Sequence, residues 1–551
     1  MAVIRVALLV LLVGGMSVQA GDWPRFRGPN GSGVSPDSSA PPTEWSPDEN
    51  IRWKVELPGP GVSSPIVVGD RVFVTCYSGY GIERGNPGEM RDLKRHLVCV
   101  DAGTGEVVWS RAVDPILPED PFSGIGVTAH GYASHTPVSD GERVYVFFGK
   151  TGALAFDMDG NQLWHTELGT ESDPWSWGSS SSPILYGNLL IVTASAESQA
   201  LVGLNRETGE EVWRQEATGL DGVWGTPALV TVSEDRTDLV LGVPGEVWAF
   251  NPENGKLRWY AEGIATDQYH SSVIVDRDVV YSIEGRSGGS VAVRAGGKGD
   301  VTDSHVLWTG SDTGRFGTPV IHDGRIYHIS NGVAKVLDAK TGDRIQQLRL
   351  QGASGGDDSE RGGRGGPGRG GFGRRGGGGG RGGDYSSPVL AGGYLYYVKA
   401  SGETHVLKAG ETLESVAVNQ TSDGDGESFG GTPAVSNGCL YLRSNRNLYC
   451  IGDGERQAAP AAVCAGGRFD IWRIADEYIR PTLCRHRVSA GNHSADSGGD
   501  RPLHGMQRPL HVAPGAGNPS GIRRLGRCPR GLRGVERADN VGGGPAAGDA
   551  I

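Results

Sequence analysis

The sequence predicts an all-β fold, an eight-bladed β-propeller whose blades are four-stranded antiparallel sheets. Three observations lead to this prediction: a recurring Ser/Thr-Pro phrase, a hairpin pattern after each copy, and a turn-plus-Trp phrase that ends most copies. Successive Ser/Thr-Pro phrases lie 44 to 46 residues apart, except for two intervals of 72 and 69 residues. A fixed period in this range is typical of solenoids and propellers.

Each Ser/Thr-Pro phrase begins an inner hairpin. An apolar run follows it, then a tight Gly-Asp, Asp-Gly or Asn-Gly turn, then a run that alternates β-branched and aromatic residues. This pattern indicates two antiparallel strands. The fifth copy has Val273 where the others have Pro. The eight copies are 62–74, 134–146, 180–192, 224–230, 269–283, 316–329, 385–398 and 429–442.

The second phrase reads DAGTGEVVW at 101–109, NRETGEEVW at 205–213 and NPENGKLRW at 251–259. Its Asp or Asn side chain caps a turn, and its Gly supplies a positive φ. The Trp then falls on the fourth, outermost strand, where we interpret it as a structural wedge between neighbouring blades. The predicted wedges are Trp53, Trp109, Trp164, Trp213, Trp259 and Trp308.

The last repeat ends at 448–452 without its outer strand. The missing piece lies near the other end of the chain, in NIRWKVELPG at 50–59, which carries Trp53. We therefore expect the N-terminal strand to complete blade eight, which removes two exposed sheet edges. The predicted propeller covers 21–456.

These repeats resemble the quinoprotein-type (PQQ-like) β-propeller, and most closely the exported bacterial PQQ-binding-like repeat proteins. The entry segment DWPRFRGPNGSGVS at 22–35 is similar to the start of many such proteins. The resemblance implies two classes of function. One is a non-catalytic scaffold, as in the propeller subunit of the outer-membrane β-barrel assembly machinery. The other is a PQQ- and calcium-dependent alcohol or sugar dehydrogenase.

The resemblance to dehydrogenases implies a calcium ion, an Asp base and often an adjacent-Cys disulfide beneath the quinone. The sequence contains no Cys-Cys pair and no CxxCH haem motif. The candidate carboxylates Asp221, Asp267, Glu284 and Asp312 match no calcium or base motif. We therefore assign no catalytic residue and no metal ligand, and expect a binding or scaffold protein of the cell envelope. PQQ with calcium is the alternative, and a polysaccharide-binding accessory protein is the second.

Aromatic residues precede most of the innermost strands, where a propeller places them at one mouth of its central channel. Such residues stack on a sugar, a quinone or a peptide side chain, or they pack between blade ends. The exposed-looking DPWSWGSS stretch makes its two Trp residues the strongest candidates. The candidates are Tyr132, His135, Trp175, Trp177, Trp224, Tyr269, His270, Phe316, Tyr385 and Phe429.

Residues 1–20 have the pattern of a secretory signal peptide with cleavage after Ala20. The apolar run is short for a membrane anchor, and no later stretch is long enough to span a bilayer. We expect an exported protein, periplasmic or extracellular, and a monomer. The net charge of −12 argues against nucleic acid as the main partner. An envelope protein or a polysaccharide is the expected partner.

Two long loops, 77–96 and 114–135, are candidates for binding. The Gly/Arg-rich insert 354–384 is expected to be disordered, as a flexible linker or a contact for acidic polymers. The tail 457–551 is rich in Arg, Gly, Pro and His but has no Lys. It resembles either a disordered extension or sequence translated out of frame, and we expect no fold there.

Two pairs of cysteines flank presumed hairpins: Cys76 with Cys99, and Cys439 with Cys450. Export permits disulfides, but spacing alone does not establish pairing across strands. Both pairings stay open on the sequence.

Overall fold

The computed structural model describes the chain from Gly21 to Gly454, apart from five gaps. The predicted signal peptide and the predicted C-terminal tail lie outside the described residues, as does nearly all of the Gly/Arg-rich insert. All described residues belong to one compact unit. The gaps are 38, 285–287, 315, 353–383 and 423–425.

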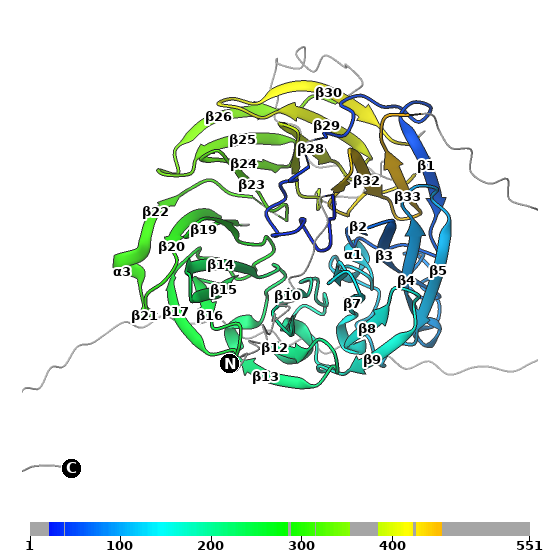
Figure 1. The fold of residues 1–551 in the computed structure, drawn as a ribbon. Helices are drawn as coiled ribbons and strands as arrows, with labels where there is room; N and C mark the ends of the chain where they lie inside the picture. The colour runs from blue at the N-terminus through cyan, green and yellow to red at the C-terminus, as the bar shows by residue number, and fades with distance from the viewer. Residues whose placement is uncertain are drawn as a thin grey trace, which may run out of the picture. The chain divides into compact units, whose positions relative to one another are not determined.

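Eight antiparallel sheets form a ring, which confirms the predicted eight-bladed propeller (Figure 1). In seven blades the strands follow chain order from the centre outward, and in blade eight the first strand of the chain takes the outermost place. The first four blades are β2 (Ile66–Val68), β3 (Arg71–Ser78), β4 (Lys94–Asp101), β5 (Val107–Val113); β6 (Val138–Ser139), β7 (Arg143–Phe147), β8 (Ala153–Asp157), β9 (Gln162–Thr166); β10 (Ile184–Tyr186), β11 (Leu189–Ala194), β12 (Ala200–Asn205), β13 (Glu211–Glu216); and β14 (Ala228–Ser233), β15 (Arg236–Val243), β16 (Glu246–Phe250), β17 (Leu257–Glu262).

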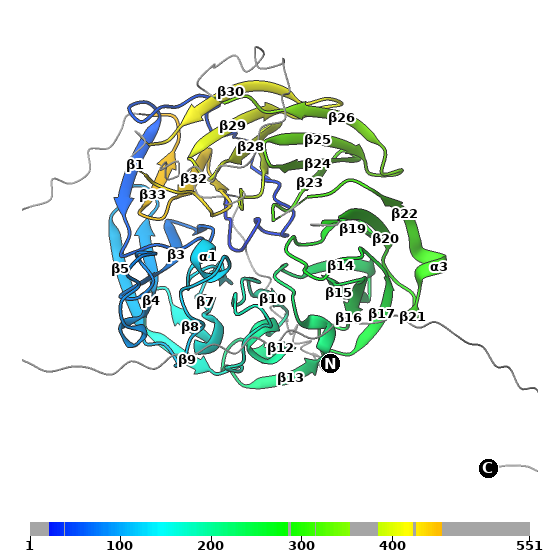
Figure 2. The same cartoon turned by 180° about the vertical axis from the view of Figure 1, so that it is seen from behind.

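The second half of the ring repeats this order, as the view from behind shows (Figure 2). Blade four gains a fifth short strand, β21 (Gly299–Asp300), parallel to β17. The remaining blades are β18 (Ile274–Asp276), β19 (Val279–Glu284), β20 (Gly289–Arg294), β22 (Val306–Gly310); β23 (Val320–His322), β24 (Arg325–Ser330), β25 (Val333–Asp338), β26 (Arg344–Arg349); β27 (Val389–Ala391), β28 (Tyr394–Val398), β29 (Glu403–Lys408), β30 (Glu414–Gln420); and β31 (Ala434–Ser436), β32 (Cys439–Arg443), β33 (Asn447–Ile451) with β1 (Ile51–Glu56).

The first strand closes the ring as predicted. β1 pairs antiparallel with β33 and forms the outer edge of blade eight, with Trp53 opposite Cys450. The described helices are single turns in the connections between strands, and none of them is long and apolar enough to cross a bilayer. They are α1 (Val127–His130), α2 (Ser195–Ser198), α3 (Thr302–His305), η1 (Met90–Asp92), η2 (Gly149–Thr151) and η3 (Thr218–Leu220).

The Ser/Thr of each repeat phrase forms a closed ring of hydrogen bonds around the centre. The backbone N–H of each donates to the side-chain hydroxyl of its counterpart in the next blade, at 2.9–3.1 Å. The bond uses the hydroxyl and not the following Pro, so the fifth repeat keeps it with Ser272 followed by Val273. The members of this hydroxyl ring are Ser64, Thr136, Ser182, Thr226, Ser272, Thr318, Ser387 and Thr432.

The six wedge tryptophans occupy equivalent places on the outer strands, each beside a register shift in the pairing. Five of them donate the indole N–H to a backbone carbonyl in the Thr-Gly-type turn of the next blade, at 2.9–3.1 Å. Trp259 instead donates to the Asp238 carboxylate at 2.7 Å, because the next blade lacks that turn in its sequence. Trp308 remains partly exposed, whereas the other five are buried.

For the five wedges that bond to such a turn, the turn glycine packs against the indole ring. Gly255 has φ +69°, and a Cβ built on it would lie 2.4 Å from Trp213 Cε3. The repeat therefore needs Gly at this position for two reasons: the backbone is left-handed, and the Trp ring lies too close for a side chain.

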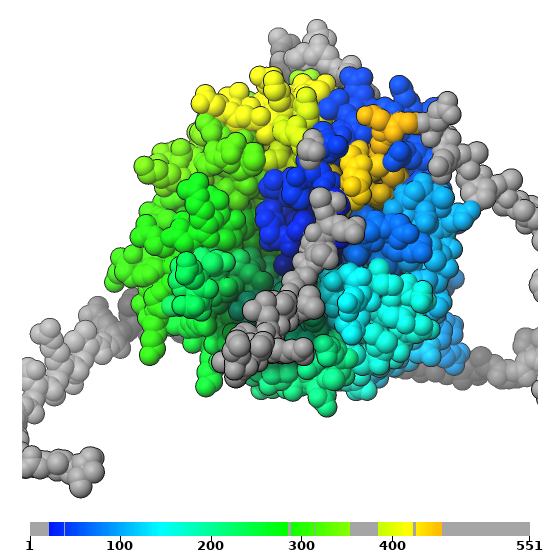
Figure 3. Space-filling model, in the orientation of Figure 1, coloured from blue at the N-terminus to red at the C-terminus, as the bar shows by residue number. Residues whose placement is uncertain are grey.

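An N-terminal segment, residues 21–45, crosses the centre of the ring before β1 begins. It is bound to distant blades: Trp23 N–H donates to Val67 O at 2.8 Å, and Ser35 N–H donates to Leu390 O at 2.7 Å. In Figure 3 this segment, in dark blue, covers the centre of the face in view. The sequence pattern did not predict this crossing.

Arg27 anchors the segment at the centre. Its guanidinium donates to Thr318 O at 2.9 Å and to Pro319 O at 2.5 Å, both in blade six. The side chain is fully buried, and this burial lowers the pKa of Arg27 to about 9.

The segment lies on the face where the inner hairpins turn. Gly69 N–H, in the β2–β3 turn, donates to Asp22 Oδ1 at 2.9 Å, and Asn437 N–H, in the β31–β32 turn, donates to Asp37 Oδ2 at 2.8 Å. Residues that precede the inner strands therefore lie at the opposite face.

The four cysteines among the described residues are buried and free, so neither open pairing is formed in this structure. Cys76 lies opposite His96, and Cys99 lies opposite Phe73.

Candidate functional site

A cavity of about 460 Å³ lies at the centre of the ring. The hydroxyl ring forms its wall. Phe26 contributes to the lining from the N-terminal segment, at the face that this segment crosses. At the other face, the exposed residues Arg84 and Ile125 border the mouth. These two residues come from the long loops that the sequence marked as binding candidates.

Aromatic side chains form a continuous arc along that open mouth. Ring centroids are 5.6 Å apart for Trp177 and Trp224, and 5.1 Å for Trp224 and His270, whose planes are nearly parallel. The arc continues from His270 to Phe316 at 5.0 Å and from Phe316 to Tyr385 at 4.4 Å. These five residues line the cavity, and we call them, together with Trp175, the aromatic crescent.

Trp175 lies at the outer end of the crescent. Its ring centroid is 5.8 Å from those of Trp177 and Trp224, and 37% of the residue is exposed. It is not among the described residues that line the cavity itself. An exposed Trp beside a cavity mouth offers a flat apolar face to a bound molecule.

Two buried carboxylates, Asp173 and Glu284, hold the crescent in position. The sequence singled out Glu284 only as a candidate carboxylate without a motif, and it did not single out Asp173. Asp173 accepts the backbone N–H groups of Trp175 and Trp177 at 2.9 and 2.7 Å, which folds their loop. Glu284 accepts the backbone N–H of His270 at 2.9 Å and lies 3.3 Å from its Nδ1. For Asp173 the one sequence signal is the Asp-Pro of DPWSWG, since Asp favours such turns.

The other four aromatic or His candidates lie away from the cavity lining. Tyr269 is fully buried, with its hydroxyl against Ser282, and Phe429 is buried against Tyr449. Tyr269 and His270 are neighbours, so their side chains leave the backbone in different directions, and only His270 lines the cavity.

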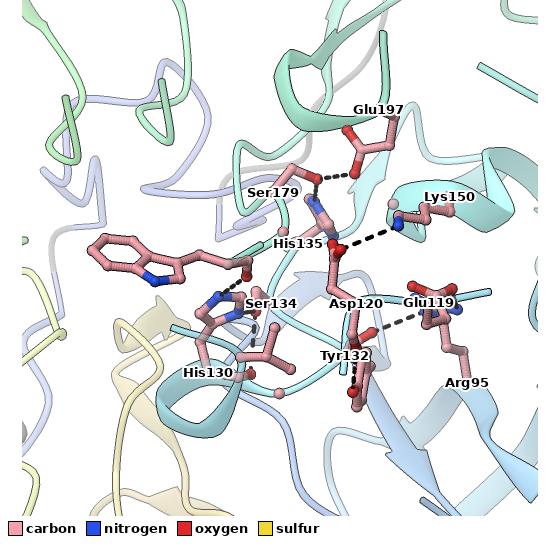
Figure 4. Close-up of a pocket in the computed structure, with 15 residues that line it drawn as sticks. Arg95, Glu119, Asp120, His130, Tyr132, Ser134, His135, Lys150, Ser179 and Glu197 are labelled. Atoms are coloured by element: carbon pink, nitrogen blue, oxygen red, sulfur yellow. Dashed lines mark hydrogen bonds and ion pairs between the residues drawn. The ribbon is translucent and has the colours of Figure 1, made fainter. Parts of the chain in front are cut away.

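Tyr132 and His135 belong to a second, smaller cavity of about 30 Å³ between blades one to three (Figure 4). The Tyr132 hydroxyl donates to Asp120 O at 2.7 Å. His135 Nε2 and Ser179 Oγ are 3.0 Å apart, and Ser179 Oγ donates to Glu197 Oε1 at 2.5 Å. A cavity of this size has room for one water molecule.

Buried ion pairs surround this small cavity. Arg95 Nη1 lies 2.7 Å from Glu119 Oε1, and Lys150 Nζ lies 3.2 Å from Asp120 Oδ1. These pairs offset the cost of burying charge beside the loop 114–135. They therefore fix the loop that borders the larger cavity.

His130 connects the two cavities, since it lines both. Its Nε2 is 2.8 Å from Trp177 O and its Nδ1 is 2.6 Å from Ser134 Oγ. A carbonyl only accepts, so Nε2 carries the hydrogen in this arrangement. Burial lowers the pKa of His130, which favours the neutral ring that fits these partners.

Burial also shifts the titration of the two groups on either side of Ser179. It lowers the pKa of His135 to about 3, with Arg95 and His130 adding to the effect, so this ring is neutral near pH 7. It raises the pKa of Glu197 to about 7. Glu197 Oε2 has no hydrogen-bond partner in the part of the chain that the structure describes.

The large cavity does not offer the ligands that calcium prefers. Calcium in proteins is bound mainly by carboxylate and carbonyl oxygens. No Asp, Glu, Asn or Gln is among the described residues that line the cavity. Groups of three or more His, Cys, Asp or Glu arranged to hold a metal are also absent from the described residues. These lining residues therefore do not fit a calcium-bound cofactor.

A family model agrees with the repeat architecture. The model described as outer membrane protein assembly factor BamB matches residues 89–219 and 192–409, which together span more than half of the chain. The protein belongs to this BamB family of PQQ-like propellers. The family assignment confirms the resemblance that the repeats predicted.

Individual relatives of this BamB-family chain are distant. A polyvinylalcohol dehydrogenase from Sphingopyxis sp. (strain 113P3) is 24% identical over 267 residues, which are 40% of this chain and 36% of that protein. The chain thus covers well under two thirds of that relative.

Two solved structures are distantly similar to this BamB-family protein. BamB from Moraxella catarrhalis is 12% identical, with a TM-score of 0.48, 74% of this chain covered and 98% of that one. Quinohemoprotein alcohol dehydrogenase ADHIIG from Pseudomonas putida HK5 is 11% identical, with a TM-score of 0.48 and coverage of 82% and 84%.

Proposed function

We propose that this protein is an exported, non-catalytic binding protein of the cell envelope, which holds its partner at the open mouth of the central cavity. The observation that carries the proposal is the lining of the cavity. It combines an aromatic crescent with hydroxyl groups and contains, among the described residues, no carboxylate that could act as a base or bind calcium.

The crescent supports binding because its rings are held in place before any ligand arrives. Asp173 and Glu284 fix the backbones of Trp177 and His270. A preorganised aromatic surface loses little conformational entropy when a ligand stacks on it. The partner that this reasoning favours is a polysaccharide or a protein segment, and the negative net charge makes nucleic acid unsuitable.

Export rests on the sequence of residues 1–20, with its apolar stretch and the Val-Gln-Ala before Gly21. We place the protein in the periplasm or outside the cell, as a monomer. N-terminal sequencing of the protein recovered from the envelope fraction tests this, with Gly21 as the expected first residue. Recovery of the intact N-terminus from the cytoplasm would contradict it.

A PQQ- and calcium-dependent dehydrogenase is the second candidate function. The similarity to a protein named polyvinylalcohol dehydrogenase favours it. Adding PQQ and Ca²⁺ to the purified full chain distinguishes the two functions. We expect no thermal shift and no dye-linked oxidation of alcohols, sugars or polyvinyl alcohol. Turnover of any of these substrates would contradict the binding function.

A further inference from the structure

The end of blade eight holds two cysteines on neighbouring strands. Cys439 begins β32, and Cys450 lies on β33, which β1 covers on its outer side (Figure 1). Tyr441 is opposite Cys450 in the antiparallel pair, and Cys439 is two residues before Tyr441. Because side chains alternate along a strand, the two cysteines point to the same face of the sheet as diagonal neighbours.

Arg52 reaches the first of these cysteines from β1. Its Nη1 donates to Cys439 Sγ at 3.2 Å. The Arg52 side chain is only partly buried, and it covers a residue that is 3% exposed. A cation at hydrogen-bond distance stabilises a thiolate relative to a thiol. The exposed side chain of Asp453, which follows β33, opposes this effect in part.

The surroundings give the two thiols different roles. A hydrogen bond from Cys450 and the charge of Arg52 lower the pKa of Cys439, whereas the same hydrogen bond and burial raise the pKa of Cys450. Cys439 is therefore the thiolate of the pair, and Cys450 keeps its proton. In the other two described cysteines burial outweighs the nearby Arg charges and raises the pKa, to about 11 for Cys76 and about 12 for Cys99.

The two cysteines lie where the pairing of β32 with β33 ends. Leu440 opposite Ile451 is the last pair, and Cys439 lies beyond it beside Gly452. A Cβ built on Gly452 would lie 2.7 Å from Cys439 Sγ, so glycine leaves the sulfur its space. A disulfide needs Cα atoms about 4.4–6.8 Å apart. Beyond the last pair of the described strands, no ladder pairing fixes that distance.

We propose that Cys439 and Cys450 form a thiol–disulfide exchange site, in which Cys439 is the attacking thiolate and Cys450 the resolving thiol. The Cys439 sulfur attacks a small disulfide, oxidised glutathione, and forms a mixed disulfide while one glutathione thiol leaves. Cys450 then gives up its proton and attacks the Cys439 sulfur, and the second glutathione leaves with a proton as its thiol. The two cysteines lose two electrons, and the glutathione disulfide gains them. This site is separate from the central cavity and does not depend on the ligand bound there.

Mass-spectrometric mapping of the full chain tests the attacking role. The native protein is labelled with iodoacetamide at pH 7, and each cysteine is read from its own peptide, so the cysteines of 457–551 are counted separately. We expect Cys439 to react at least about tenfold faster than Cys76 and Cys99, because the thiolate is the reactive form. A rate at Cys439 no higher than that at Cys99 would refute the attacking role.

Variants of Arg52 separate an electrostatic effect from a structural one. In Arg52→Gln the midpoint of the pH–rate profile at Cys439 should rise by about one pH unit or more, and Arg52→Lys should restore it. Arg71→Gln is the matched control, since Arg71 is partly buried in blade one beside Asp70 and Asp101. It should leave the profile at Cys439 unchanged. Identical profiles for the natural protein and Arg52→Gln would show that the cation has no such role.

Oxidation tests the resolving role. With oxidised glutathione the full chain should yield a pair of peptides linked through Cys439 and Cys450, whereas Cys450→Ala should keep glutathione on Cys439. Circular dichroism shows whether Cys450→Ala is folded; if it is not, the linked peptides of the natural protein decide. Three results would overturn the proposal: no modification of Cys439, glutathione retained on Cys439 in the natural protein, or a link from Cys439 to a cysteine of 457–551 in place of Cys450.

Discussion

Replacing the turn glycine beneath a wedge tryptophan measures how much the contact between blades contributes to stability. In Gly255→Ala the new methyl group would lie 2.4 Å from Trp213 Cε3, well inside van der Waals contact. The indole cannot move away freely, because it is buried and its N–H donates to Pro252 O at 3.1 Å. Gly324→Ala is the matched control: its φ of +72° is close to the +69° of Gly255, but nothing lies within 4 Å of its added methyl.

Both variants should lose roughly 1–2 kcal/mol from the left-handed backbone conformation alone. Gly255→Ala should lose roughly 1–3 kcal/mol more, the usual cost of overpacking a buried site. Urea titration of both variants, followed by circular dichroism and Trp fluorescence, gives the difference from the shift of the unfolding midpoint at constant slope. Equal destabilisation of the two variants would refute the idea that the wedge requires glycine.

Three further predictions concern the ring, the small cavity and the termini. Thr226→Val leaves the buried N–H of Ser182 without its acceptor and should cost roughly 1–3 kcal/mol in urea unfolding; no loss would mean that the hydroxyl ring is not structural. Burial raises the pKa of Glu197 from 4.5 to about 7, so ionisation disfavours the folded state. Stability relative to Glu197→Gln should therefore fall by about 3 kcal/mol as pH rises from 4.5 to 7, then level off, as measured by urea unfolding at each pH; a parallel pH dependence in the two proteins would refute it. Deleting 21–58 should leave β33 unpaired and destabilise the ring, whereas deleting 457–551 should leave the thermal midpoint unchanged, since all eight blades are complete before it; the reverse order of stability would contradict the closure.

The architecture could be predicted from the sequence because the repeat records local and nearest-neighbour interactions. Each blade needs its own turns, inner strands and wedge, so the same residue types return at the same spacing. Ring closure was also predictable, since the last repeat lacked an outer strand and 50–59 supplied one with Trp53. The hydrogen-bond partner of Trp259 could not be predicted. The following blade lacks the turn whose carbonyl accepts the other indoles, and the Asp238 carboxylate accepts the Trp259 N–H instead.

The site was predictable only in outline. The position before each inner strand placed aromatic residues near one mouth, but a one-residue difference separates the buried Tyr269 from the cavity-lining His270. The N-terminal segment has no period, and its contacts are with blades far away in the sequence. Arg27, for example, binds carbonyls almost three hundred residues away, at Thr318 and Pro319. No local pattern reports such contacts.

Each Ser or Thr of the hydroxyl ring contributes both to the contact between blades and to the cavity wall, because a hydroxyl can accept one hydrogen bond while it donates another. In Thr226 one lone pair accepts the N–H of the preceding blade, while the O–H hydrogen stays available to the cavity. Ser in its place keeps both capacities, and Val removes both. All eight hydroxyls line the cavity, so a change such as Thr226→Val alters both the contact between two blades and the polarity of the cavity wall.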